Sequence, residues 1–339
     1  IGAVFPDVIW HTEKPLVRTA PAPLFLLSRL VKDNGYKVVL TGEGADEILA
    51  GYDIFKEDKI RRFLARDPDS AMRPLILRRL YPYLENSPTR SLEYARRFFD
   101  STNSVYDRRF RSHVPRWDLT SKTQFFFADT VKSALADYDS RDELDSLVPR
   151  AVSGLDPLSR AQYVEIKTLL SGYLLCSQGD RMSMAHSVEG RFPFLDHRVI
   201  EYCARVPARI RMPALREKDV LKRSMRGHIP ESVLDRTKQP YRAPDASSFL
   251  GTEEPDYVKD LLSPVNLEKS GYFNSRATEH LLAKCRKGRA VGFKDNMAVV
   301  GIVSTLLLHD QFVENFHSKA RETLKRKEDA EFEGIEVAD

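Results

Sequence analysis

Three carboxylates lie within five residues of one another in the sequence, and they are the first candidates for catalytic or binding residues. They are Glu43, Asp46 and Glu47. Negative charges this close together disfavour the ionised forms unless a cation, a substrate amine or a helix N-terminus compensates them. Capping of a helix start accounts for Glu47. Glu43 precedes the expected helix and lies between two glycines, so it is the carboxylate that most calls for a ligand.

The residues around Glu43 form a turn that a nucleotide can approach. The turn, Thr41-Gly42-Glu43-Gly44, lies where a strand is expected to end and a helix to begin. Sheets of α/β proteins bind ligands at this place, outside the carboxyl ends of parallel strands. A Gly-x-Gly pair alone also reverses a chain without binding anything, so both interpretations stay open for this feature.

Two lysines are candidates for binding an anion. Lys167 lies inside an apolar helical stretch, where an unpaired ammonium is disfavoured, so it either reaches solvent along its own stem or meets an anion. Lys218 lies in the charged run Arg216-Glu217-Lys218-Asp219 and is equally consistent with a solvated charge. Local sequence does not decide between these alternatives.

The run from Asp180 to Asp196 mixes charges with Met, Phe and Val. Charges among apolar residues are more often an internal ion network than catalytic groups, and we expect this for Glu189, Arg191 and Asp196. We expect His186 to be packed rather than a metal ligand, because no second histidine lies at metal-binding spacing.

The elements around the turn follow the order of a parallel sheet. Residues 24–31 predict a largely buried helix that ends at Asn34-Gly35, and residues 36–40 predict a short buried strand. The glycine turn then leads into a helix around Ile48. Helix, strand, glycine turn and helix in this order are typical of an α/β fold with a parallel sheet.

Most of the remaining chain is expected to be helical. The pattern predicts charged surface helices over 56–147, helices from Pro157 to Ser183, over 218–225 and over 296–312, and an irregular loop over 239–246. We therefore expect three parts, which are an α/β core remnant over 1–55, a mostly helical remainder over 56–316 and a charged tail over 317–339.

Composition excludes several classes of protein. With 53 Lys+Arg against 49 Asp+Glu among 339 residues, the net charge of +4 lacks the electrostatic signature of a nucleic-acid binder. Three cysteines without Cys-x-x-Cys spacing favour a reducing, cytoplasmic setting. We see no apolar run of about 18 residues and no leader, so no membrane span is expected. Because the chain opens at Ile1, we expect a longer parent polypeptide.

Three segments, in this order, resemble the synthetase domain of the glutamine-hydrolysing asparagine synthetase family, over roughly Val8 to Phe312. The matching residues are Leu40–Glu47 with Gly51-Tyr52, then Asp180–Ala185 continuing through Glu189–Asp196, then Lys218 with Ile229-Pro230-Glu231 and Lys238-Gln239. The resemblance implies an α/β fold of the PP-loop ATP-pyrophosphatase type (adenine nucleotide α-hydrolase-like), here with an incomplete parallel sheet and a large helical portion.

The resemblance also implies a reaction. The family adenylates the side-chain carboxylate of aspartate with ATP and Mg²⁺, releases pyrophosphate, and lets ammonia displace AMP. By position, Thr41, Gly42 and Gly44 look like contacts to ATP, Glu43 like the acid that handles the acyl-adenylate and ammonia, and Asp46 like a ligand of Mg²⁺ or of the substrate amine. Lys167 and Lys218 are similar to the basic residues that neutralise phosphates, which is worth several kcal/mol in a dry site.

The chain departs from the family pattern at several points. The signature S-G-G-x-D-S loop that grips pyrophosphate is absent, as is the glutaminase domain that supplies ammonia from glutamine, so this chain alone is expected neither to hydrolyse glutamine nor to bind ATP well. Gln178 is neutral where some asparagine synthetases have a basic residue, so the acceptor acid is open. Glu43 favours attack by external ammonia, because the related β-lactam synthetases tend to carry tyrosine there.

Other interpretations stay open. An amidotransferase of the same family would act on another carboxylate, in secondary metabolism or polysaccharide assembly, with the same activation motifs. A non-catalytic scaffold would have no need of the opposed charges at Glu43, Asp46, Lys167 and Lys218. Binding of nucleic acid would rest on patches such as Arg61-Arg62 and Arg108-Arg109, which solvated helix faces explain better. A homodimer is compatible with the resemblance.

Overall fold

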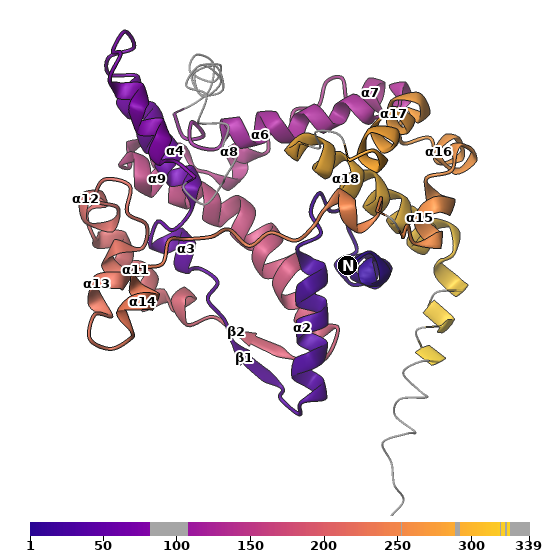
Figure 1. The fold of residues 1–339 in the computed structure, drawn as a ribbon, viewed down its shortest axis with the longest axis horizontal. Coiled ribbons are helices and arrows are strands. Elements are labelled where there is room, and N and C mark those ends of the chain that lie inside the picture. The colour runs from indigo at the N-terminus through magenta and orange to yellow at the C-terminus, as the bar shows by residue number, and fades with distance from the viewer. Residues whose placement is uncertain (82–107, 252, 289–291, 319, 323, 326–339) are drawn as a thin grey trace, which may run out of the picture. The chain divides into compact units, whose positions relative to one another are not determined.

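The computed structural model describes residues 1–81, 108–251, 253–288, 292–318, 320–322 and 324–325 (Figure 1). The chain forms two compact units that interleave along the sequence. Unit 1 comprises residues 1–26, 123–136 and 243–339, and unit 2 comprises 27–122 and 137–242. The division at residues 55 and 316 stays a prediction, and most of the expected charged tail lies outside the described residues.

Unit 2 contains both strands of the described chain and most of its short helices. The helix α2, Pro21–Asp33, leads into it from unit 1, and its end before Asn34 and Gly35 agrees with the sequence. The strands and helices are β1 Val38–Leu40, α3 Ala45–Ile48, α4 Asp53–Leu64, α6 Val114–Ser121, α8 Leu144–Leu147, α9 Pro157–Glu165, α10 Arg181–Met184, β2 Glu189–Arg191, α11 His197–Arg205, α12 Ala208–Arg211, α13 Asp219–Ser224 and α14 Glu231–Leu234. Between α9 and α10, residues Ile166–Asp180 form a π-helix.

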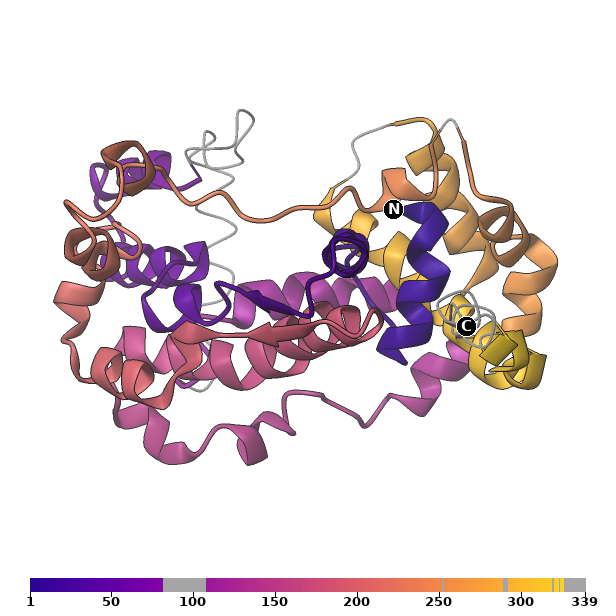
Figure 2. The same ribbon diagram turned by 90° about the horizontal axis from the view of Figure 1, so that it is seen from below.

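The two strands pair in parallel, as the order of elements predicts. Val38 is opposite Glu189 and Leu40 is opposite Arg191, and Figure 2 shows the two strands side by side. The expectation of a buried strand is wrong, because Val38 is 39% and Leu40 75% exposed. Within the described residues β1 pairs with β2 alone, and the first and last residues of each strand are exposed.

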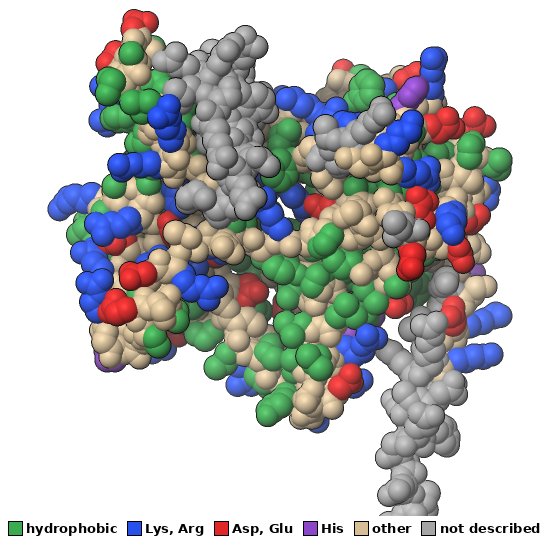
Figure 3. Space-filling model, in the orientation of Figure 1, with side chains coloured by type: hydrophobic (Ala, Val, Ile, Leu, Met, Phe, Trp, Pro, Cys, Tyr) green, Lys and Arg blue, Asp and Glu red, His purple; other side chains and the backbone are tan. Residues whose placement is uncertain are grey.

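Hydrophobic side chains gather over α2 and the strand pair on the face that Figure 3 shows. Among them Leu27 and Leu30 of α2 are more than half exposed, as are Tyr36 and Leu40 around β1. Large groups of neighbouring exposed apolar side chains are uncommon on the surface of a monomeric soluble protein.

The core of unit 2 lies between α4, α9 and α12. Ile54 and Phe55 of α4 pack with Leu158 and Ala161 of α9 and with Met212. The expected helix with apolar residues three or four apart is confirmed for α4, which buries residues such as Ile54 and Phe55, and residues 82–107 of the expected helical stretch lie outside the described part. Apolar residues three and four apart mark one face of a helix, and tertiary packing decided that this face is inside.

Unit 1 is built around one apolar helix. Its helices are α1 Phe5–Thr12, the first half of α2, α7 Asp129–Ala134, α15 Asp256–Leu261, α16 Pro264–Ser270, α17 Ser275–Arg286 and α18 Phe293–His309, which continues as a π-helix over Asp310–Glu314. Val299, Val300 and Val303 of α18 are fully buried, and α18 contacts α1, α15 and α17.

The helix Phe293–Glu314 is long and apolar enough to cross a membrane by length and composition alone, so the expectation that no such stretch exists is wrong. Within the structure, 56% of its most apolar window is buried. A central core helix reaches the same composition because it contacts other helices on several sides. The cellular location stays a prediction.

The other connections within the described ranges include short 3₁₀ turns and extended segments. The turns are Gly2–Val4, Arg73–Arg79, Lys122–Phe126, Arg150–Gly154, Pro193–Leu195 and Ala246–Ser248. The expected irregular loop is confirmed, since residues 235–245 have no helix or strand.

Candidate functional site

The acidic turn directly follows β1 and is held in register by β2. The backbone N–H of Thr41 donates to the carbonyl of Arg191, 2.9 Å away. Gly44 caps α3 with φ of 89°, a conformation that favours glycine, and a Cβ there would lie 2.2 Å from Cδ2 of Leu195. The glycine therefore lets α3 begin close against the 193–195 turn, with Asp46 and Glu47 in its first turn.

Asp46 binds two lysines from distant parts of the chain. Nζ of Lys218 lies 2.9 Å from Oδ1 of Asp46, and Nζ of Lys238 lies 2.8 Å from Oδ2. Lys218 is the N-cap of α13, with φ of 50°, and Lys238 belongs to the irregular segment after α14. One of the three crowded carboxylates, Asp46, thus has the cationic compensation that their spacing called for. We name Asp46, Lys218 and Lys238 the lysine clamp.

Gly51 gives the clamp its room. Its N–H donates to the carbonyl of Asp46 at 2.7 Å. A Cβ at this position would lie 2.0 Å from Oδ1 of Asp46 and 2.6 Å from Cε of Lys218. Any larger residue would therefore occupy the space in which the two side chains meet.

A second layer of charges holds Lys238 in place. Its backbone N–H donates to Oε1 of Glu217 at 3.0 Å, and its ammonium lies 5.8 Å from the centre of the Tyr52 ring. Burial opposes ionisation of Glu217, but the bond from Lys56, 2.8 Å long, and the Lys238 amide outweigh it and lower the pKa of this carboxyl. Lys238 is thus anchored through both its backbone and its side chain.

Glu47 is buried, whereas the neighbouring Asp46 faces the two lysines. Glu47 is 1% exposed, and its Oε1 accepts from the Tyr52 hydroxyl at 2.9 Å. Burial raises the pKa of Glu47, and burial together with the adjacent Glu47 raises the pKa of Tyr52. The hydroxyl therefore stays protonated and donates to Glu47.

Helix α9 stabilises the start of α3, next to the turn, through a hydrogen bond to the backbone. The Gln162 amide donates to the carbonyl of Glu47 at 2.6 Å, and its oxygen accepts from Arg211. One turn further along α9, the fully buried Glu165 accepts from His113 at 2.6 Å and from Arg116 at 2.9 Å. Burial alone raises the pKa of Glu165, but the Arg116 charge and the His113 bond hold it at about 2. None of these supporting residues has a local sequence signal, because their partners are far away in the chain.

Three buried oxygens of the site have no hydrogen-bond partner among the described residues: Oγ1 of Thr41, Oε2 of Glu43 and Oδ1 of Asp46, the last of which forms an ion pair with Lys218. Buried polar atoms are satisfied in the great majority of cases, so orphaned ones call for a ligand or a water. All three belong to residues that the sequence marks as binding, catalytic or metal-ligand candidates.

Other residues singled out in the sequence lie elsewhere. Lys167 is exposed on the π-helix, and nothing in the described structure joins its ammonium to the clamp. The expected internal ion network of Glu189, Arg191 and Asp196 is wrong. Glu189 and Arg191 pair 2.9 Å apart with both side chains 59% exposed, and Asp196 pairs instead with the exposed Arg198 at 2.7 Å. Glu189 and Arg191 are the two end residues of β2, and both are exposed. His186 is packed as expected, with Nδ1 2.8 Å from the Ser28 hydroxyl.

A metal centre is not assembled by the described residues, which contain no group of three His, Cys, Asp or Glu able to hold an ion. Asp46 offers one carboxylate, and both of its oxygens already face lysines. The assignment of Mg²⁺ to Asp46 therefore stays a prediction.

Comparison with known proteins finds relatives that match most of the chain. The chain is 28% identical over 309 residues to "Amidase chyE" of Penicillium rubens, covering 84% of this chain and 43% of that protein. It is 26% identical over 301 residues to "Amidase chry2" of Gibberella zeae, covering 81% and 42%. It is 28% identical over 262 residues to "Asparagine synthetase [glutamine-hydrolyzing] 1" of Bacillus subtilis, covering 76% and 38%.

The chain thus spans less than half the length of the curated relatives that it matches. The family model of asparagine synthase matches residues 1–310, which is nearly the whole chain and includes the turn, both lysines of the clamp and α9. The chain belongs to the asparagine synthase family.

Proposed function

We propose that this chain is part of an ATP-dependent ligase that converts a carboxylate into an amide. The observation that carries the proposal is the lysine clamp beside Glu43, at the carboxyl end of a parallel strand. In the reaction, the substrate carboxylate attacks the α-phosphorus of ATP and pyrophosphate leaves. Ammonia then attacks the acyl-adenylate, an amide forms, AMP leaves and one proton is released.

The clamp supplies the positive charge that this reaction needs. Pyrophosphate carries charge that builds up as it leaves, and Lys218 and Lys238 present two ammonium groups on one carboxylate. Their side chains are 22% and 24% exposed, so the ammonium groups are partly desolvated and still reachable. A phosphate oxygen can share these ammonium groups with Asp46, because each carries three protons.

Glu43 is proposed to take the proton from ammonia. Its Oε2 is buried without a described partner, so the oxygen is available to accept a hydrogen bond from an incoming amine. Thr41 has the same kind of orphaned oxygen, which suits a contact to the nucleotide. When bound, ATP supplies the activating adenylyl group. Mg²⁺ would need ligands beyond those described, and we assign no step to it.

Aspartate is the first candidate for the acceptor acid, which would make the reaction asparagine synthesis. A second candidate is a different carboxylate. It is favoured by the neutral, half-buried Gln178 and by the similarity to two fungal proteins whose names are amidases rather than asparagine synthetases. In either case we propose that glutamine supplies the ammonia through a glutaminase domain outside the matched region.

The test is release of pyrophosphate by the longest polypeptide that the gene encodes, with ATP, Mg²⁺, ammonia and a panel of acids led by aspartate. Glu43→Gln removes the proposed base with little change of shape, and Glu189→Gln makes the same change at an exposed site. We expect turnover to fall about 100-fold or more in the first and to persist in the second. Turnover with another acid alone would replace aspartate, and no turnover with any acid would refute the ligase.

A further inference from the structure

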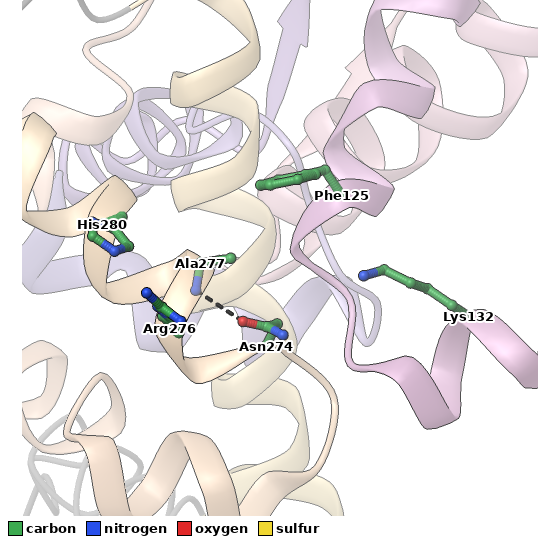
Figure 4. A pocket seen from close by; sticks show the side chains of 6 residues that line it. All are labelled: Phe125, Lys132, Asn274, Arg276, Ala277 and His280. Atoms are coloured by element: carbon green, nitrogen blue, oxygen red, sulfur yellow. Dashed lines mark hydrogen bonds between the residues drawn. The ribbon is translucent and has the colours of Figure 1, made fainter.

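Unit 1 contains a hollow beside the first turn of α17. It has a volume of about 270 Å³ and is lined by Phe125, Lys132, Asn274, Arg276, Ala277 and His280 (Figure 4). The dashed line joins Oδ1 of Asn274 to the N–H of Ala277 at 2.9 Å, a bond that caps α17. The lining contains no carboxylate, so no ion pair crosses the hollow. Charged side chains meet instead around the lysine clamp of unit 2.

Glu217 joins the lysine clamp to helix α4. Its Oε2 lies 2.8 Å from Nζ of Lys56, and its Oε1 accepts from the N–H of Lys238 at 3.0 Å. Lys56 belongs to α4, and its ammonium also lies 3.2 Å from Oδ1 of Asp53. The side chains of Lys56 and Glu217 are 9% and 10% exposed, so the pair is largely withdrawn from water. Such a pair keeps its geometry, because either charge without the other is costly to bury.

Lys238 depends on bonds of this kind, because it lies in a segment without helix or strand, residues 235–245. The segment is tied at two neighbouring points. The N–H of Lys238 donates to Glu217, and the carbonyl of Arg236 accepts from Nζ of Lys222 at 2.9 Å. The Lys222 ammonium is itself 3.9 Å from Oε1 of Glu217. The Glu217 carboxylate therefore lies where the contacts that direct Lys238 towards Asp46 come together.

Lys218 follows Glu217 directly and has a strained backbone. Its φ of 50° lies in the left-handed region, which residues other than glycine rarely adopt. Such a conformation costs free energy and persists where the surrounding contacts enforce it. Here the carboxylates on both sides are held by ion pairs of 2.8 Å, Glu217 by Lys56 and Asp219 by Arg223. These two pairs flank the residue whose ammonium meets Asp46.

We propose that Glu217 is a positioning residue, which sets the places of both clamp ammonium groups against the leaving pyrophosphate. This role rests on the ligase reaction proposed above. Glu217 holds Lys238 by its backbone and Lys218 through the chain, so both ammonium groups are left to Asp46 and to a phosphate. Lys56 balances the charge of Glu217. Without Lys56, a second buried carboxylate would compete for the clamp lysines.

The test is the affinity for pyrophosphate, measured by calorimetric titration of the longest polypeptide that the gene encodes. Lys56→Met removes the ammonium and keeps an apolar stem of similar length. Glu217→Gln removes the charge, so that Lys56 is left without its partner. We expect each variant to weaken pyrophosphate binding about tenfold. Lys56→Arg keeps the charge beside Glu217 and should bind pyrophosphate within about threefold of the parent.

Arg62→Met is the matched control. Arg62 lies on the same helix and pairs at 2.8 Å with the buried Asp58 rather than with Glu217, so its loss should cost stability and leave the Kd for pyrophosphate unchanged. A purely structural role of Glu217 would lower the number of binding sites in the titration without changing this Kd. Equal weakening by Lys56→Met and Arg62→Met would overturn the positioning role, as would parental affinity in Lys56→Met and Glu217→Gln.

The titration also separates this role from the reaction. Absence of pyrophosphate binding by the parent protein up to about 10 mM would overturn the positioning role. If the parent binds pyrophosphate and the variants differ as expected, but no acid supports release of pyrophosphate from ATP, then the ligase reaction fails and the action of Glu217 on the clamp stands.

Discussion

Lys238 lies 192 residues after Asp46 in the chain, yet its ammonium lies 2.8 Å from the Asp46 carboxylate. Lys218 approaches the other oxygen of the same carboxylate at 2.9 Å. This shared carboxylate holds two cations together that would otherwise repel each other, so its geometry governs both the stability of the turn and the charge presented to a ligand.

Gly51→Ala should pull the lysine clamp apart. The new methyl would lie 2.0 Å from Oδ1 of Asp46, so the carboxylate or the Lys218 stem has to move. We expect a loss of about 1–3 kcal/mol in the free energy of unfolding, measured with urea, and loss of pyrophosphate release. Gly42→Ala is the control for stability, because its methyl meets nothing within 4 Å and should change stability by less than about 1 kcal/mol. Equal effects of both variants would show that the clamp is not tightly packed.

Glu165→Gln should destabilise unit 2 strongly. The carboxylate is fully buried between His113 and Arg116, and its removal leaves both without their charged partner. We expect a loss of about 3 kcal/mol or more at pH 7, measured by urea unfolding. Glu201→Gln, at an exposed pair of 3.8 Å, should change stability by less than about 1 kcal/mol.

The same carboxylate predicts a pH dependence. The pKa of Glu165 is about 2, below its ordinary 4.5. The ionised carboxylate therefore contributes fully to the free energy of unfolding above pH 4.5, and this contribution is lost as the pH falls towards 2. The difference between the pKa of Glu165 in the folded and in the unfolded chain corresponds to about 3 kcal/mol of stability. Burial lowers the pKa of His113, so protonation of this residue in the unfolded chain also favours unfolding in acid. Stability should therefore fall between pH 7 and 3, and the fall below pH 4.5 should be smaller in Glu165→Gln. Parallel profiles of the two proteins would contradict this.

Gln162→Glu should separate support of the turn from packing of α9. The glutamate still accepts from Arg211, but it cannot donate to the Glu47 carbonyl. We expect a loss of about 1–3 kcal/mol, because a buried carbonyl loses its donor. Urea unfolding measures the loss, with the exposed Gln124→Glu as the matched change. If Gln162→Glu is as stable as the parent, the bond to Glu47 does not hold the turn.

Ser304→Ala tests the core of unit 1. The buried hydroxyl accepts from the N–H of Leu16 at 3.0 Å and lies 2.7 Å from the carbonyl of the same residue. Its removal leaves both backbone groups without this partner, and we expect a loss of about 1–3 kcal/mol by urea unfolding. Thr305→Ala, whose hydroxyl bonds only within α18 to Gly301, should cost less than about 1 kcal/mol. An equal loss in the two variants would count against the Leu16 contact.

Local residues predicted much of the fold around the turn. The end of α2 near Gly35, the short strand, the glycine turn and the parallel pairing all follow from glycine placement and apolar runs, which act over a few residues. The exposure of Leu40 was not predictable in this way, because burial of a strand depends on what else packs against it.

The candidate site was likewise predictable from the sequence only in part. Crowding of Glu43, Asp46 and Glu47 marked the place and called for a cation, which is a statement about neighbouring charges that the sequence contains by itself. The path of the chain decides which lysines lie close enough to pair with these carboxylates. Lys218 and Lys238 reach Asp46, whereas Lys167 is exposed on the π-helix.

The sequence by itself therefore determined the family, the local conformation of the turn and the chemical need for compensating charge. Only the tertiary structure decided that Lys238 closes the clamp, that Gln162 supports the turn, and that Glu47 is buried while Asp46 faces the lysines. The reason is physical. Turn and helix preferences arise from backbone sterics and spacing over a few residues, whereas ion pairs and burial depend on segments that folding alone brings within a few ångströms of one another.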